Sequence, residues 1–290
     1  MKNNRLSAKE WGERFVLAVL FTALGSYMMI VFNPWGSGPL LHNRVEDYLA
    51  KISTSIVLLV AALLVRRSKR FEKYWQILYA LFTMSVVVSL DLIFGIYGVY
   101  YLKIDGNSPV GFALEKLNEC FAVVGVVVTF TLLSGGSLGS IYIQKGKLKL
   151  GLIIGLVTFI LAAAGSIPMA NLFNAKDLSL ARIIPWIPWV LIAVLANATL
   201  EELWFRGLFL RKLQPFFGNF ISIFLIAFVF TLMHGSVTYT ASNAIFLAIV
   251  FPLALAWGSV MQKTDSVWAS ILFHAGMDIP IFLGIFSNFK

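Results

Sequence analysis

Charged residues and cysteines are both scarce in this sequence. Only 13% of the 290 residues are Asp, Glu, Lys or Arg, whereas 59% are hydrophobic and the mean hydropathy is +0.84. A soluble domain carries about twice this share of charged residues. The single cysteine, Cys120, excludes an intramolecular disulfide, and we expect it to pack inside an apolar segment. The composition therefore excludes a soluble globular protein and indicates an integral membrane protein.

Several common functional signatures are also missing from the sequence. It has no Walker A loop, no dinucleotide-binding fingerprint and no H-E-x-x-H zinc motif. The net charge is +9, but the basic residues lie in short loops between apolar runs, where membrane topology explains them. We therefore expect a lipid bilayer as the main partner and no binding of nucleic acid.

Long apolar runs recur along the whole chain. A helix needs about 20 apolar residues to cross a hydrocarbon core of about 30 Å, and a helix satisfies its own backbone hydrogen bonds in lipid. We predict an all-α fold, a polytopic transmembrane helical bundle of about eight or nine spans that forms a single membrane domain over residues 1–290. The predicted segments are 15–33, 48–65, 76–101, 117–134, 151–170, 183–205, 219–235, 243–261 and 266–286.

The distribution of Lys and Arg predicts the orientation of the chain. If the N-terminus is cytoplasmic, most of the 23 basic residues fall on the cytoplasmic side, as the positive-inside rule requires. The first apolar run follows basic residues as in a signal peptide, but it has no small-residue cleavage site and is expected to remain as the first span. We therefore expect a multi-pass integral membrane protein.

Charged side chains inside apolar segments mark functional sites, because they are costly in a bilayer. The stretch N-A-T-L-E-E-L-W-F-R-G follows an uncharged run from Ile183 to Leu200. Glu202 and Arg206 are four residues apart and can pair on one helical face, whereas Glu201 shares a different face with Asn197. Alternatively, both glutamates belong to a belt of charges at the membrane interface.

Two histidines lie in the apolar segments that follow. His234 ends F-T-L-M-H, and H-A-G-M-D places His274 and Asp278 on one helical face, where each can orient the other. Such residues also occur as hydrogen-bonded packing groups. Together with the glutamates they supply the groups needed to activate water or to bind a metal ion. Asp91, in an earlier segment, has no basic neighbour in the sequence and no assigned role.

In this order, the motifs E-E-x-x-x-R, F-x-x-x-H and H-x-x-x-D resemble those of the CAAX protease and bacteriocin-processing family. These proteins are intramembrane glutamic endopeptidases and include the type II CAAX prenyl endopeptidase. The resemblance covers residues 183–286, the expected helical core with the catalytic motifs. Residues 1–182, expected to be variable N-terminal spans, are similar only in being hydrophobic and multi-spanning.

The resemblance implies a role for each matching residue. Glu201 would be the general base for a water that His234 shares, and His274 with the residue four positions later would stabilise an oxyanion. Glu202, Arg206 and Asn197 would support these catalytic residues.

Position 278 departs from the family pattern, which has asparagine where this sequence has aspartate. An ionised carboxylate cannot donate a hydrogen bond to an oxyanion. Asp278 is therefore protonated, orients His274 or binds a ligand, and the sequence leaves these three roles open.

The segment boundaries conflict with the implied site. They place Glu201 and His234 at opposite ends of consecutive helices, too far apart to share a water. We give the motifs precedence, so we expect either that segment 219–235 is re-entrant or that the boundaries near residue 200 differ.

The resemblance implies an endopeptidase without a cofactor. It would process a membrane-associated or lipid-modified protein, or a bacterial peptide such as a pheromone or bacteriocin. One alternative is a zinc-dependent metalloprotease with Glu201, His234 and His274 as ligands. Two others are a non-catalytic immunity or scaffold protein and a proton-coupled transporter, although the inverted repeats of many transporters are not evident in the sequence.

Overall fold

The computed structural model describes residues 7–33, 40–90, 103–237 and 239–289. Their regular structure is helical throughout, without a strand, so the predicted all-α class is confirmed for this part of the chain. The main helices are α1 (Ala8–Val31), α2 (Arg44–Arg67), α3 (Trp75–Ser89), α5 (Pro109–Leu133), α6 (Leu148–Ala164), α7 (Ser166–Ala170), α8 (Leu180–Glu201), α9 (Leu208–Met233), α10 (Asn243–Thr264) and α11 (Val267–Ser287). A π-helix, Glu202–Gly207, joins α8 to α9, and 3₁₀ turns include Asn171–Phe173 and His234–Ser236.

The length and hydropathy of the helices fit a multi-pass membrane protein. Within the described ranges, six helical stretches can cross a membrane, or seven if α6 and the bent segment that follows it count as one span. One stretch, Leu180–Ser236, is 57 residues long and contains two predicted segments, 183–205 and 219–235. The predicted segment 76–101 continues beyond the described residues, and Asp91 lies outside them.

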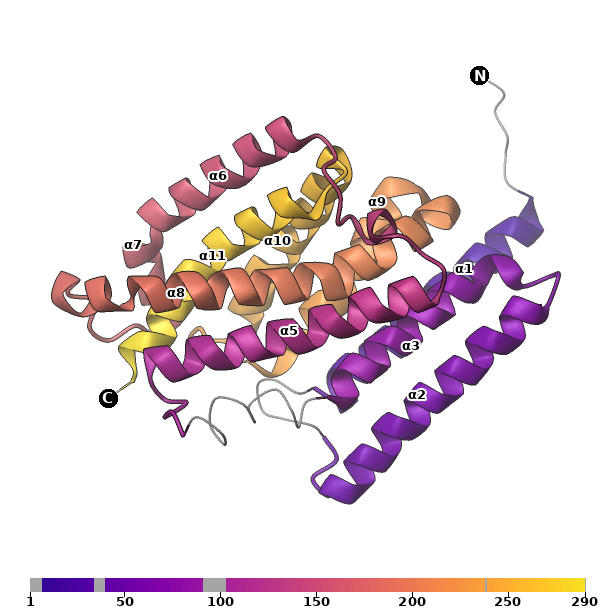
Figure 1. The fold of residues 1–290 in the computed structure, drawn as a ribbon, viewed down its shortest axis with the longest axis horizontal. Helices are drawn as coiled ribbons and strands as arrows, with labels where there is room; N and C mark the ends of the chain where they lie inside the picture. Colours follow the sequence, from indigo (N-terminus) through magenta and orange to yellow (C-terminus); the bar gives the residue numbers. More distant parts are fainter. Residues whose placement is uncertain (1–6, 34–39, 91–102, 238, 290) are drawn as a thin grey trace.

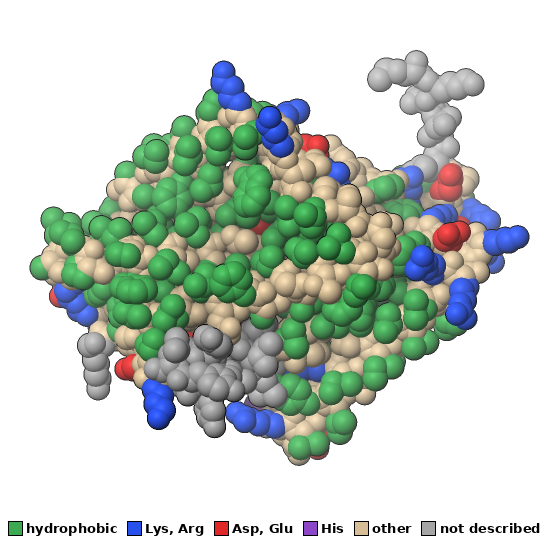
Figure 2. Space-filling view, in the orientation of Figure 1, with side chains coloured by type: hydrophobic (Ala, Val, Ile, Leu, Met, Phe, Trp, Pro, Cys, Tyr) green, Lys and Arg blue, Asp and Glu red, His purple; other side chains and the backbone are tan. Residues whose placement is uncertain are grey.

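Helix α11 is the central helix of the bundle (Figure 1). It packs along both α6 and α8, and 72% of its most apolar stretch is buried, against 17% for α2 at the outer side of the molecule. Hydrophobic side chains cover the middle of the face in Figure 2, and Lys and Arg side chains gather towards its edges. This distribution suits a protein surrounded by lipid. Because α11 is the most buried of these helices, its polar side chains are the best shielded from the lipid.

Glycines allow α11 to lie close to α6. A Cβ atom added at Gly276 of α11 would be 2.7 Å from the backbone Cα of Phe159, and one at Gly155 of α6 would be 2.9 Å from Leu272. The hydrophobic effect does not drive helices together in lipid, because the lipid tails are also apolar. Close van der Waals packing of this kind is therefore an important source of attraction between them. The contact fixes the position of α11, which carries His274 and Asp278.

Helix α8, the π-helix and α9 form a helical hairpin that reverses at Gly218. This glycine lies within the span of α9 but has φ 70° and ψ −173°, a conformation that disfavours other residues. The rings of Phe205 and Phe230, one on each arm, are in contact with their centroids 5.1 Å apart. Because Glu201 precedes Gly218 by 17 residues and His234 follows it by 16, the two lie at the same level of the hairpin.

The predicted boundary at residue 205 is therefore wrong. The helix that carries Glu201 continues through the π-helix to the turn at Gly218, and segment 219–235 is the returning arm. Glu201 lies inside a continuous helical stretch and not at the end of one. The geometric conflict between Glu201 and His234 disappears with this correction.

The α6–α11 contact generates a prediction about stability. Gly276→Ala should destabilise the protein by about 1–3 kcal/mol, because the new methyl group meets backbone atoms that cannot move aside. Gly125→Ala in α5 is the matched control, since nothing lies within 4 Å of its added Cβ, and its effect should stay within about 1 kcal/mol. Thermal unfolding in detergent micelles would compare them, and equal midpoints for both variants would contradict the proposed role of Gly276.

Candidate active site

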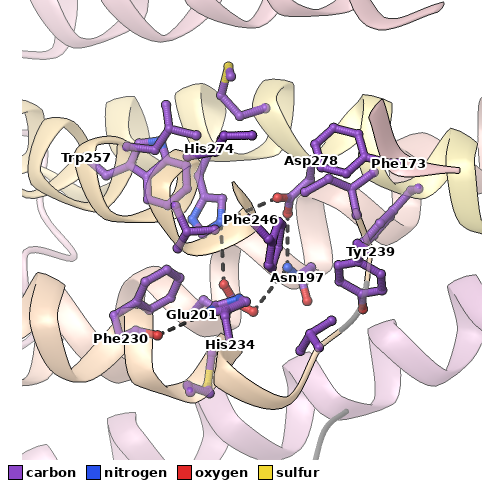
Figure 3. A pocket seen from close by; sticks show the side chains of 18 of the residues that line it. Phe173, Asn197, Glu201, Phe230, His234, Tyr239, Phe246, Trp257, His274 and Asp278 are labelled. Atoms are coloured by element: carbon purple, nitrogen blue, oxygen red, sulfur yellow. Dashed lines mark hydrogen bonds and ion pairs between the residues drawn. The ribbon is translucent and has the colours of Figure 1, made fainter. Parts of the chain in front are cut away.

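All the residues predicted to be catalytic line one cavity (Figure 3). The space inside the cavity that water can occupy is about 100 Å³, and the cavity lies between α5, α8, α9, α10 and α11. Most of its wall is apolar. The side chains on the wall that can donate or accept hydrogen bonds are those of Lys116, Asn197, Glu201, His234, Tyr239, Trp257, His274 and Asp278.

Glu202 and Arg206 form the ion pair that their spacing predicts. Arg206 Nη1 lies 2.9 Å from Glu202 Oε1, and both side chains are almost completely buried. The guanidinium group also lies over the ring of Phe230, 4.1 Å from its centroid, and near that of Trp257. Pairing and cation–π contact compensate for the loss of hydration of the arginine. The pair therefore fixes the start of the π-helix beside the cavity.

His274 contacts three carboxylates. Its Nδ1 lies 2.8 Å from Glu202 Oε1, and because a carboxylate paired with arginine only accepts, Nδ1 is the donor. On the other side of the ring, Nε2 lies 3.4 Å from Glu201 Oε2 and 3.6 Å from Asp278 Oδ1. The indole of Trp257 stacks on the imidazole at 3.7 Å between centroids. Orienting His274 was one of the three roles left open for Asp278, and Glu202 makes a shorter contact with the ring than Asp278 does.

Asn197 connects the two other carboxylates of the site. Its Nδ2 donates to Glu201 Oε1 at 3.3 Å and to Asp278 Oδ2 at 3.0 Å, so it links α8 to α11. Glu201 Oε2 is buried and accepts no hydrogen bond from the described residues. His274 Nε2 lies 3.4 Å from this oxygen, which keeps lone pairs that can accept a hydrogen bond from a water or a substrate in the cavity.

His234 begins the 3₁₀ turn that follows α9. Its Nδ1 lies 3.0 Å from the carbonyl oxygen of Phe230, which can only accept, so Nδ1 carries a hydrogen. In the neutral ring Nε2 is then the nitrogen with the free electron pair. Figure 3 shows the ring beside Glu201 at the cavity wall, as the hairpin geometry requires.

Sequence reasoning did not identify Ser270, Trp257, Lys116 or Tyr239 as part of this region. Ser270 donates to Glu202 Oε2, and its place one helical turn before His274 on α11 was a usable signal. Lys116 pairs with Glu119 at 2.7 Å on α5. Burial raises the pKa of the Tyr239 phenol, so this group remains neutral at physiological pH. Trp257 and Tyr239 are ordinary aromatic residues in the sequence and carry no signal.

The zinc alternative requires Glu201, His234 and His274 to converge on one metal ion. In the part of the chain that the structure describes, no three or more His, Cys, Asp or Glu side chains are grouped so as to hold a metal ion. Glu201, His234 and His274 share the cavity without forming such a group. We therefore derive no chemical step through a metal.

Comparison with known proteins supports a protease. Residues 183–280 match the family model described as type II CAAX prenyl endopeptidase Rce1-like. No curated protein and no solved structure was found to match the chain. The matched segment runs from α8 into α11 and includes Glu201, His234, His274 and Asp278. The resemblance inferred from the motifs is thus confirmed over this segment, and the match supports a CAAX-type intramembrane protease in general.

The buried ion pair generates a second prediction about stability. Arg206→Met should destabilise the protein by about 3–5 kcal/mol, because it leaves the Glu202 carboxylate buried without its cation. Arg211→Met, which removes the partly exposed pair with Asp265, should cost about 0–1 kcal/mol. The double variant Glu202→Gln/Arg206→Met should recover part of the loss. Thermal unfolding would measure all three, and equal effects of the two arginine variants would refute the assigned importance of this pair.

Proposed function

We propose that the protein is an intramembrane endopeptidase that hydrolyses peptide bonds with a water activated by Glu201 and His234. The observation that supports this function is the buried Glu201 Oε2, which no described residue hydrogen-bonds. It lies in the same cavity as two histidines, inside a segment that matches a protease family.

The first step is attack by water. A water between Glu201 Oε2 and His234 Nε2 transfers a proton to Glu201 while its oxygen bonds to the scissile carbonyl carbon. The π-electron pair of the carbonyl moves to its oxygen, which becomes an oxyanion. His274, when it carries a hydrogen on Nε2, can donate to that oxyanion.

The second step is loss of the amine. The oxyanion re-forms the carbonyl double bond as the C–N bond breaks. The electron pair of the broken bond stays with nitrogen and takes up the proton that Glu201 received, so Glu201 returns to its initial state and an acid and an amine are released. Glu202 keeps the His274 ring in place through Nδ1. Asp278 Oδ1 lies 3.6 Å from His274 Nε2. Of the three roles left open for Asp278, this contact favours that of orienting His274.

The apolar residues on the cavity wall support an apolar substrate that arrives from the bilayer. Half-buried or exposed apolar side chains on α7, its 3₁₀ extension, α10 and α11 line the cavity: Met169, Leu172, Ile249, Leu253, Met277 and Ile281. An opening of this composition admits an apolar peptide segment or a lipid chain. We therefore propose a membrane-associated or lipid-modified protein as substrate, or, in a bacterial plasma membrane, a peptide pheromone or bacteriocin.

The proposed chemistry predicts the effect of removing its base. Purified protein in liposomes should cleave members of a quenched fluorescent peptide library that includes lipidated peptides. Glu201→Gln and His234→Ala should each lower kcat at least about 100-fold, because they remove groups that hold and deprotonate the water. The matched controls are Glu46→Gln and His42→Ala, which change the same residue types at exposed positions and should retain activity.

A chelator distinguishes the remaining alternatives. Cleavage that is unaffected by chelator supports the glutamic mechanism, whereas loss of cleavage that zinc restores would move the site to a metalloprotease. Full activity of Glu201→Gln would rule out the proposed base. Failure of the wild type with every member of the library would favour the immunity or scaffold function.

The proposed opening can be tested separately. Leu172 is 57% exposed and lines the cavity, so Leu172→Gln should raise KM for an apolar substrate by about threefold to tenfold through lost apolar contact. The value of kcat should change little, because the reacting groups stay in place. Leu133→Gln on α5, equally apolar but outside the cavity, is the control. Equal KM values for both variants would argue against this opening.

A further inference from the structure

Helix α1 contacts the arm of the hairpin that leads to His234. An added Cβ at Gly25 would lie 2.9 Å from the side chain of Val229 on α9. Helix α1 also contacts the other arm, where the rings of Phe21 and Phe209 meet with their centroids 5.1 Å apart. Because the family match begins at residue 183, α1 lies in a part of the chain to which that match gives no role.

Asn33, just beyond the end of α1, contacts the backbone and side chain on either side of His234. Its Nδ2 donates to the carbonyl oxygen of Met233 at 2.9 Å and to Ser236 Oγ at 2.8 Å. These contacts join residues about 200 positions apart in the sequence, and Asn33 is only 3% exposed. The two hydrogens of one amide group are enough to make both bonds.

The contacted groups lie at the C-terminal end of α9 and in the 3₁₀ turn that follows it. The last carbonyl groups of a helix have no partner within it, and Met233 is the last residue of α9. The 3₁₀ turn then lasts for three residues before Val237 becomes extended. Asn33 therefore supplies a partner at the point where the backbone leaves the helix.

The orientation of His234 depends on this end of the helix. The ring bonds through Nδ1 to the carbonyl of Phe230, one turn earlier, so ring and backbone move together. A shift of about 1 Å in a catalytic group can reduce a rate about 100-fold. Fixing residues 233 and 236 fixes the position from which Nε2 reaches the cavity.

We propose that Asn33 is a positioning residue for His234, through which the N-terminal part of the chain contributes to catalysis. The inference rests on the proposed function, in which His234 holds the attacking water. The side-chain amide must be a donor here, because the carbonyl of Met233 and the hydroxyl oxygen of Ser236 both accept from it. Aspartate has the same shape without the N–H groups and would set an oxygen against the carbonyl of Met233.

The first test compares Asn33→Ala and Asn33→Asp with Asn288→Ala in the cleavage assay. Asn288 is the control, because its Nδ2 also makes two hydrogen bonds, in this case to the backbone oxygens of Asn174 and Gly284, and neither partner is next to His234 in the sequence. Both Asn33 variants should lower kcat by about 10-fold to 100-fold with KM within about threefold, and Asn33→Asp should be the slower. Asn288→Ala should retain kcat within about twofold.

A double-mutant cycle with His234 separates positioning from general loss of structure. If Asn33 acts through His234, Asn33→Ala should cause no further loss of rate when His234 is already alanine. Independent losses that multiply would overturn the inference. The inference would also be overturned if Asn33→Ala and Asn288→Ala lowered the melting temperature and kcat by equal amounts.

The third measurement does not require activity. The chain has three histidines, so the imidazole nitrogen signals of protein labelled with ¹⁵N-histidine can be assigned by single substitutions. Asn33→Ala should shift or broaden the signals of His234 and leave those of His42 and His274 in place. Unchanged His234 signals would overturn the inference even if cleavage is confirmed. Shifted signals in a protein that cleaves no peptide would instead point to failure of the proposed function.

Discussion

The carboxylate of Glu202 holds the candidate site together. It accepts hydrogen bonds from Arg206 in its own hairpin and from Ser270 and His274 on α11, and its side chain is completely buried. A buried carboxylate without partners would cost several kcal/mol, so each of these donors is needed where the fold places it. Because one oxygen serves both Arg206 and His274, the ion pair and the orientation of the imidazole cannot change independently. The other nitrogen of the ring is thereby directed at Glu201.

The polar groups of the site and the contacts that hold them come from different parts of the chain. The segment that matches the family, 183–280, contains the glutamates and both histidines of the cavity. Earlier helices surround it: α6 lies against α11 through Gly155, α5 brings Lys116 to the cavity, and Asn33 follows α1. Motifs alone would therefore describe the reacting groups and the Glu202–Arg206 pair, but not the supports that come from earlier helices. A protein reduced to the matched segment would lose these supports.

Much of this arrangement could be predicted where it depends on local periodicity. The helical class follows from apolar runs, and the Glu202–Arg206 and Asn197–Glu201 contacts follow from four-residue spacing. The end of the first hairpin arm was missed, because Arg206, Arg211 and Lys212 interrupt the apolar run while the helix continues to Gly218. The Pro215 and Gly218 pair was the better signal for the turn.

Contacts between distant residues could not be predicted in this way. Glu202 and His274 are 72 positions apart, and spacing within one helix gives no information about which groups face each other across two helices. The same applies to Asn33 and to Trp257, whose residue types are ordinary in their local sequence. The sequence showed that Asp278, when ionised, cannot donate a hydrogen bond to an oxyanion. The structure adds Asn197 and His274 as its neighbours.

The hairpin at Gly218 requires Glu201 on one arm to stay opposite His234 on the other. This requirement restricts the number of residues in each arm more than it restricts which apolar residues the arms contain. Adding one residue to a helix moves everything beyond it by about 1.5 Å and rotates it by about 100°. An insertion between Glu201 and Gly218 would turn Glu201 away from His234 unless the other arm changed to match. Apolar residues in the arms can therefore be exchanged for one another, whereas the number of residues in each arm has to be kept.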